Sequence, residues 1–82
     1  MTNEEVAFCN LVQSYILGTF GYLVLSLDRT VEGQTYILRA KRLGDAESSI
    51  KRFPVFPDQL MNSIRTCQLP ESLFRDFSVW LK

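Results

Sequence analysis

Residues 22–43 read YLVLSLDRTVEGQTYILRAKRL, and this stretch decides the fold. Its first part, 22–29, is mainly apolar, and its second part, 34–43, is both apolar and basic. Glu32 and Gly33 lie between the two parts, where a turn is expected. The stretch therefore predicts a β-hairpin with strands over 22–29 and 34–43.

The turn also predicts a register for the hairpin. If 32 and 33 form the tip, residues whose numbers sum to 65 lie opposite each other, so Leu27 faces Leu38 and Leu25 faces Ala40. Side chains alternate between the faces of a strand. One face, the predicted core face, then holds Leu23, Leu25, Leu27, Leu38 and Ala40. The other face holds Val24, Ser26, Asp28, Ile37, Arg39 and Lys41, with Asp28 close enough to pair with Arg39.

A helix is predicted before the hairpin. The residues Thr2-Asn3-Glu4-Glu5 fit a capping box, and apolar residues then repeat at helical spacing. This pattern predicts a helix over Asn3–Leu17 that Gly18 ends in a left-handed conformation. After the hairpin, a third strand is predicted over Ile50–Phe56, at a sheet edge because Pro54 has no N–H to donate.

Two more helices are predicted after the third strand, one over Asp58–Cys67 and one opened by Pro70-Glu71. The last helix has an apolar stripe that we expect to enter the core, made of Leu73, Phe74, Phe77, Trp80 and Leu81. The whole chain, residues 1–82, is expected to form a single small α+β domain. Its predicted order is one N-terminal helix, a three-stranded antiparallel β-meander and two C-terminal helices, α-β-β-β-α-α.

The chain has 9 basic and 9 acidic residues, so its formal net charge is zero. A dedicated nucleic-acid or membrane-surface binder usually carries a basic excess, so the composition counts against both classes. The charge is segregated, because residues 1–34 carry a net −3 and residues 35–65 a net +3. A net charge near zero favours self-association, so a homodimer is one expected form.

The sequence has no signal-peptide pattern at its acidic N-terminus, and its apolar runs are far shorter than the ~20 residues of a membrane helix. We therefore expect a cytoplasmic protein with no membrane partner. Cys9 and Cys67 are expected as reduced, buried thiols on helices, with a disulfide between them as the alternative.

The inventory of catalytic residues is poor. The chain has no histidine, which removes the commonest general base and metal ligand. Its four glycines form no phosphate-binding pattern, and two cysteines without histidine cannot complete a zinc site. The nearest catalytic set is Asp28, Glu32 and Tyr36, and we interpret its acids as turn residues. We expect no enzyme activity, no cofactor, no metal and no small-molecule substrate.

The candidate partner-binding residues are Val24, Ile37, Arg39, Lys41, Lys51 and Arg52. Their cations can serve solubility at a sheet edge, contact an acidic protein, or contact a nucleic-acid backbone. Stacking of bases requires exposed aromatic residues, and the predicted register puts Tyr22 and Tyr36 on opposite faces.

The leading hypothesis is a non-catalytic, protein-binding or regulatory factor, such as an adaptor, an inhibitor of a larger complex or an accessory protein. It would act through a sheet face or edge and its basic strip. A nucleic-acid-binding module that uses the basic strands is the alternative. Either one of the three helices covers Val24 and Ile37, or the face that holds them is an interface.

Overall fold

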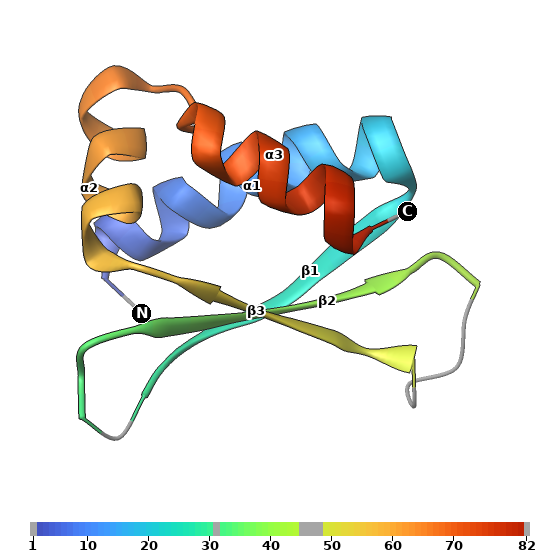
Figure 1. Cartoon of the computed structure of the whole chain (residues 1–82), viewed down its shortest axis with the longest axis horizontal. Helices are drawn as coiled ribbons and strands as arrows, with labels where there is room; N and C mark the ends of the chain where they lie inside the picture. Colours follow the sequence, from blue (N-terminus) through green and yellow to red (C-terminus); the bar gives the residue numbers. More distant parts are fainter. Residues whose placement is uncertain (1, 31, 45–48, 82) are drawn as a thin grey trace.

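The computed structural model describes residues 2–30, 32–44 and 49–81 (Figure 1). Its elements are α1 (Asn3–Phe20), β1 (Tyr22–Arg29), β2 (Tyr36–Arg42), β3 (Lys51–Val55), α2 (Pro57–Thr66) and α3 (Glu71–Trp80). The strands form one antiparallel sheet in the order β1-β2-β3. This confirms the predicted α+β fold and its α-β-β-β-α-α order. None of the described helices has the length and apolar character needed to cross a membrane.

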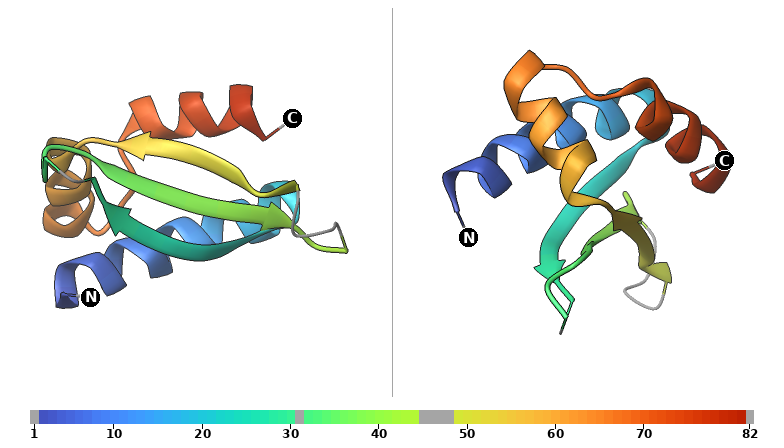
Figure 2. Two further views of the ribbon diagram at one scale, coloured as in Figure 1. Left: turned by 90° about the horizontal axis from the view of Figure 1, so that it is seen from below. Right: turned by 60° about the vertical axis from the view of Figure 1, so that its left-hand side comes forward.

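The molecule has two layers. Figure 1 shows α1 and α3 above the strands, and Figure 2 shows that all three helices lie on the same side of the sheet. The left view of Figure 2 looks onto the other side, which no described helix or strand covers. The sheet therefore has an inner face, packed on the helices, and an uncovered outer face.

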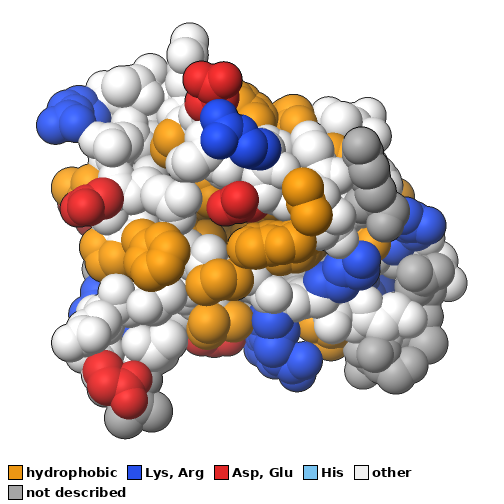
Figure 3. Space-filling model, viewed as in Figure 1, with side chains coloured by type: hydrophobic (Ala, Val, Ile, Leu, Met, Phe, Trp, Pro, Cys, Tyr) orange, Lys and Arg blue, Asp and Glu red, His pale blue; other side chains and the backbone are white. Residues whose placement is uncertain are grey.

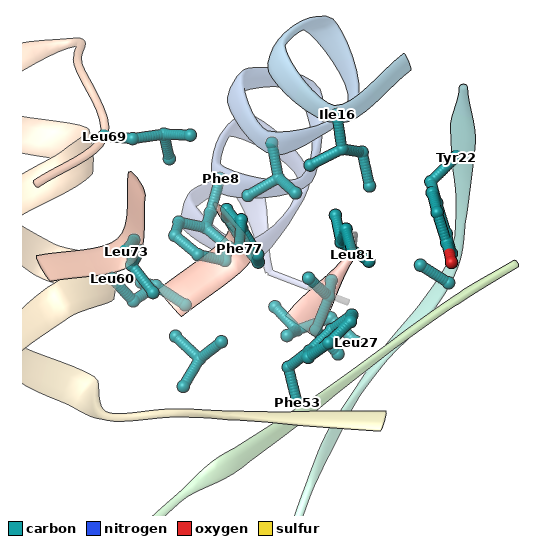
Figure 4. Packing of buried hydrophobic residues seen from close by; sticks show 14 residues of the cluster. Phe8, Ile16, Tyr22, Leu27, Phe53, Leu60, Leu69, Leu73, Phe77 and Leu81 are labelled. Carbon is teal, nitrogen blue, oxygen red and sulfur yellow. The ribbon is translucent and has the colours of Figure 1, made fainter. Parts of the chain in front are cut away.

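The core fills the space between the helices and the inner face of the sheet (Figure 4). Its buried residues are Phe8, Val12, Ile16, Tyr22, Leu27, Leu38, Ala40, Phe53, Val55, Leu60, Leu69, Leu73, Phe77 and Leu81. Leu27, Leu38 and Ala40 confirm three of the five core positions predicted in the hairpin. In α3 the predicted stripe is confirmed, although Phe74 and Trp80 are only half-buried.

Helix α1 begins as predicted and ends later than predicted. The Thr2 backbone N–H donates to Glu5 Oε1 at 2.8 Å, and the Glu5 N–H donates to Thr2 Oγ1 at 3.2 Å, which completes the capping box. Gly18 does not end the helix. The left-handed residue is Gly21, with φ 74°, and its N–H donates to the Leu17 carbonyl at 3.1 Å. A glycine inside a helix costs only about 1 kcal/mol, so the helix continues through Gly18.

The predicted register of the hairpin is correct near the turn and wrong near the start of β1. Leu27 lies opposite Leu38 as predicted, but Val24 rather than Leu25 lies opposite Ala40. The shift arises from a β-bulge at Leu25, where β1 contains one extra residue. From there towards the start of β1 the predicted faces are exchanged. Val24 therefore packs against the core, Leu23 lies opposite Lys41 on the outer face, and Leu25 is 44% exposed.

The side chain of Gln13 holds the edge of the sheet beside this bulge. Its Oε1 accepts from the Val24 N–H at 2.9 Å, and its Nε2 donates to the Tyr22 carbonyl at 3.3 Å. Gln13 thus satisfies backbone groups on the free edge of β1, which would otherwise be available to another strand. The Gln13 side chain thus makes two hydrogen bonds of the kind that a neighbouring strand would make.

The end of α2 differs from the prediction. Helix α2 ends at Thr66, and Cys67 follows it in a left-handed conformation, with φ 56°. Cys67 is consequently exposed rather than buried in a helix, whereas Cys9 is half-buried on α1, and both are free thiols. The expectation of two buried helical thiols is therefore wrong for Cys67.

Candidate functional site: the open face of the sheet

The outer face of the sheet, called the open face from here on, is the candidate site. The strand register assigns to it Leu23, Leu25, Ser26, Asp28, Ile37, Arg39, Lys41, Arg52 and Pro54. None of these side chains reaches the burial of the inner face, where Leu38, Ala40 and Val55 have no exposed surface. Within the described residues, the open face is therefore less buried than the inner face.

Cations occupy the middle of the open face. Arg39 on β2 lies directly opposite Arg52 on β3, and Lys41 is the next residue of β2 on the same face. Within the described residues the side chain of Arg52 makes no hydrogen bond and no ion pair, and the residue is exposed. Like charges at directly opposite positions of a strand pair destabilise the sheet. A bound anion would relieve this repulsion.

Arg39 is held in place by β1. Its Nε donates to Ser26 Oγ at 2.7 Å and lies 3.4 Å from Asp28 Oδ2, while Ser26 Oγ donates to the same Asp28 oxygen at 3.1 Å. The predicted pairing of Asp28 with Arg39 is confirmed. Both contacts are made by Nε, so neither uses the end of the guanidinium that carries the two Nη groups. That end suits a carboxylate, which it can bind through two hydrogen bonds.

Apolar side chains lie beside the cations on the open face. Leu23 and Leu25 lie towards the start of β1, and Leu25 shares its position opposite Arg39 with Ser26 because of the bulge. At the other end of the face, Ile37 lies opposite Pro54. An apolar contact with charged residues beside it is typical of protein interfaces.

The structure brings four of the six predicted site residues together and separates the other two. Ile37, Arg39, Lys41 and Arg52 share the open face. Val24 faces the core, because the bulge moves it to the inner side.

Lys51 also lies on the inner side, opposite the buried residue Ala40. Its Nζ donates to the carbonyl of Trp80 at 2.7 Å, and it lies 6.0 Å from the centre of the Tyr22 ring. A cation at the last carbonyls of a helix stabilises the helix end. Lys51 therefore anchors α3 to the sheet.

Leu23 and Leu25 were missed as surface residues because the sequence indicates them as core. They are leucines in an apolar strand, and no local pattern distinguishes a bulge there from regular pairing. The only signal is a polar residue on the facing helix, Gln13, and its effect depends on contacts that a single sequence does not reveal.

The tyrosines of the hairpin do not lie on the open face. Tyr22 is buried in the core and Tyr36 packs against it, so both are on the inner side, and the predicted placement on opposite faces is wrong. The bulge is again the reason. Among the residues assigned to the open face there is no aromatic ring on which a base could stack.

The candidate catalytic set does not converge. Asp28 belongs to the open face, whereas the Tyr36 ring lies on the inner side, with its hydroxyl accepting from Arg29 Nη2 at 3.3 Å. In the part of the chain that the structure describes, no three His, Cys, Asp or Glu residues are close enough to hold a metal ion. Asp28 and Tyr36 therefore lie on different sides of the sheet, and Glu32 is an exposed residue of the turn.

The pKa shifts of Glu5 and Cys9 have structural causes. The Thr2 backbone N–H lowers the pKa of Glu5, and burial opposes this effect. Burial raises the pKa of the Cys9 thiol, and the charge of Glu5 raises it further. A raised pKa leaves Cys9 protonated and weakly nucleophilic at neutral pH.

Two adjoining hollows lie in the helical layer, with volumes of about 320 and 300 Å³. Both are lined by Leu11 and Ser14 of α1, one towards Ile64 and Cys67 and the other towards Phe74. No charged side chain lines either hollow. Their polar lining consists of uncharged groups, such as Ser14 in both hollows, Asn10 in one and Gln68 in the other.

A further group of hydrophobic side chains lies between α3 and β3 on the side of the molecule drawn in Figure 3. Trp80 of α3 stacks on Phe53 of β3, with 4.9 Å between ring centres, and Phe53 belongs to the core. Val79 and Phe56 are exposed, by 70% and 55%. Trp80 thus packs against the edge of the core, whereas Val79 and Phe56 do not belong to it.

No protein-family model, curated protein or solved structure matched the chain in the three comparisons. A function is therefore inferred from the open face itself.

Proposed function

We propose that the protein is a non-catalytic, protein-binding factor of a regulatory or accessory kind that binds its partner through the open face. The observation that supports this most is the directly opposed pair Arg39 and Arg52 on a sheet face that no described element covers, where Asp28 contacts Arg39 only. A charge on the edge strand β3 can also prevent aggregation, but that role does not require a second arginine directly opposite it, where the two repel.

The composition of the face supports a protein partner. The exposed Leu25 and the half-buried Ile37 offer apolar contact, and Arg39 is already oriented by its contacts with Ser26 and Asp28. Arginine is among the residues that contribute most to binding at protein interfaces, and orientation before binding lowers the entropy cost.

Nucleic acid is the alternative, because the same arginines can contact phosphate groups. It receives less support, since Tyr22 and Tyr36 lie on the inner side and the chain has no net positive charge. Binding of that class would be strongly weakened by salt.

Affinity capture from the cells that express the protein tests the proposal. The wild-type chain is compared with Arg39→Glu/Lys41→Glu and with Arg65→Glu/Arg75→Glu, a control with the same change of charge on α2 and α3. A protein partner that is lost with the first variant and kept with the second supports the proposal. A partner kept by both variants would contradict it, and so would nuclease-sensitive capture of nucleic acid alone.

A further inference from the structure

We infer that the open face takes an acidic, amphipathic helix of a partner protein, laid along the strands. This inference rests on the proposed function and specifies the chemistry and shape of what the face binds.

The positive charge of the open face favours a partner with acidic groups. Arg39 and Arg52 lie opposite each other, and Lys41 follows Arg39 two residues further along β2. Among the described residues assigned to the face, Asp28 is the single acid. Asp28 already contacts Nε of Arg39 at 3.4 Å. A carboxylate placed between the two arginines would accept hydrogen bonds from both and remove their repulsion.

The edges of the sheet oppose addition of a strand. On β1 the groups of Tyr22 and Val24 are already bonded to Gln13, and the bulge at Leu25 interrupts regular pairing. On β3 the edge contains Pro54, which has no N–H. Bulges and edge prolines are devices that prevent strand addition. The partner is therefore placed on the face rather than at an edge.

A helix is the form that suits the face. An extended segment lying across it would find few acceptors for its own N–H groups, because the face offers mainly apolar groups and cations and the oxygens of Ser26 and Asp28 already contact Arg39. A helix satisfies its backbone internally and presents only side chains. The inner face of the same sheet is covered by helices in this manner.

The spacing of the face matches a helix that runs along the strands. The row of Leu23 and Lys41 is followed by the row of Arg39 and then by that of Ile37, with two strand residues or about 6.6 Å between rows. Four residues of helix advance about 6 Å. A stripe that is apolar at position i, acidic at i+4 and apolar at i+8 would therefore contact the three rows in order.

A second copy of the chain fits the face less well. In a two-fold dimer each copy presents the same patch to the other, so the cationic central row would face itself. No described carboxylate other than Asp28 is assigned to the face to compensate. The repulsion favours a different, acidic chain as the occupant.

Binding of designed peptides to the full chain tests the inference. The probe is a labelled helical peptide of roughly 18 residues, long enough to form a helix in water, with Leu, Glu and Leu at i, i+4 and i+8. A second peptide has Lys in place of Glu, and a third has a central proline that breaks the helix. Fluorescence anisotropy at low ionic strength measures their affinities.

We expect the Glu peptide to bind, and its affinity to fall about tenfold with Arg39→Glu/Arg52→Glu but not with Arg65→Glu/Arg75→Glu. The Lys peptide should not bind, and the proline peptide should bind at least about tenfold more weakly. Equal affinity of the three peptides, or no binding of the Glu peptide, would overturn the inference. So would a dimer of the protein that Arg39→Glu/Arg52→Glu dissociates.

The proposed function and the helical occupant can be disproved separately. If affinity capture finds a partner that needs the open face while the Glu peptide does not bind, the proposed function stands and the helical occupant is wrong. If capture finds no partner that depends on the face, both are wrong.

Discussion

Arg39 and Arg52 lie directly opposite each other on the face of the sheet that no described helix covers. The fold does not require this arrangement, since neither side chain enters the core. Residues of a binding surface are often less than optimal for stability, because their best partner is absent from the isolated chain. Substitutions at Arg39 and Arg52 should therefore weaken binding without lowering the stability of the fold.

Replacing Arg52 by glutamate should stabilise the protein and weaken its binding. The substitution turns a cross-strand repulsion with Arg39 into an attraction, which should raise the free energy of unfolding by about 0.5 kcal/mol. Urea denaturation measures this change, and Arg52→Gln is the control that removes the charge without reversing it. A less stable Arg52→Glu protein with unchanged partner binding would contradict the account.

The bulge predicts different outcomes for two nearby leucines. Leu25 is 44% exposed, so Leu25→Ser should change the free energy of unfolding by less than about 0.5 kcal/mol. Leu27 is 5% exposed, so Leu27→Ala should lower it by about 3 kcal/mol. Chemical denaturation of both variants checks the register. Equal losses at the two positions would mean that Leu25 is a core residue.

Removing the Gln13 side chain should weaken the protein and uncover the β1 edge. Gln13→Ala deletes two hydrogen bonds to β1, at an expected cost of about 2 kcal/mol. The freed edge should also promote self-association, visible as a concentration-dependent elution volume in size-exclusion chromatography. Asn10→Ala, at an exposed position of the same helix, is the control. A stable, monomeric Gln13→Ala protein would show that the edge needs no protection.

The capping box predicts a loss of stability in acid. The pKa of Glu5 is lower in the folded protein than its ordinary value of 4.5, chiefly because the Thr2 N–H donates to it. The stabilisation from this carboxylate is therefore present above pH 4.5 and is lost as the pH falls through its folded pKa. In Glu5→Gln the free energy of unfolding should depend less on pH below this value. Identical pH profiles of wild type and Glu5→Gln would exclude this contribution.

The two thiols should differ in reactivity. Cys67 is exposed, whereas Cys9 is half-buried and burial raises the pKa of its thiol. A thiol-specific disulfide reagent should therefore modify Cys67 first and Cys9 slowly, at neutral pH and without denaturant. Cys67→Ser should abolish the fast phase and Cys9→Ser the slow one. Faster modification of Cys9 would contradict the packing of α1.

The sequence predicts the elements of the fold well because their signals are local. Apolar periodicity indicates helices and strands, and the capping box at Thr2 marks the start of α1 within one residue of its observed position. The pairing of Leu27 with Leu38 also follows from the position of the turn, since both residues lie close to it.

The candidate site was predicted only in part, because two of its determinants are not local. The bulge at Leu25 lies beside contacts from Gln13 on another element, and it exchanges the faces of Leu23 and Val24. Lys51 looks like its neighbour Arg52 in sequence, but the carbonyl of Trp80, 29 residues away, is its partner. Neither contact has a signature in the residues around it.

The central claim is that the open face is the surface that binds the partner, and photo-crosslinking in living cells tests it most directly. A photoreactive amino acid is placed at Leu25 on the open face or at Met61, which is 54% exposed on α2 in the helical layer. The account predicts a crosslink to a different protein from position 25 and none from position 61. A crosslink to that protein from position 61 with none from position 25 would contradict it.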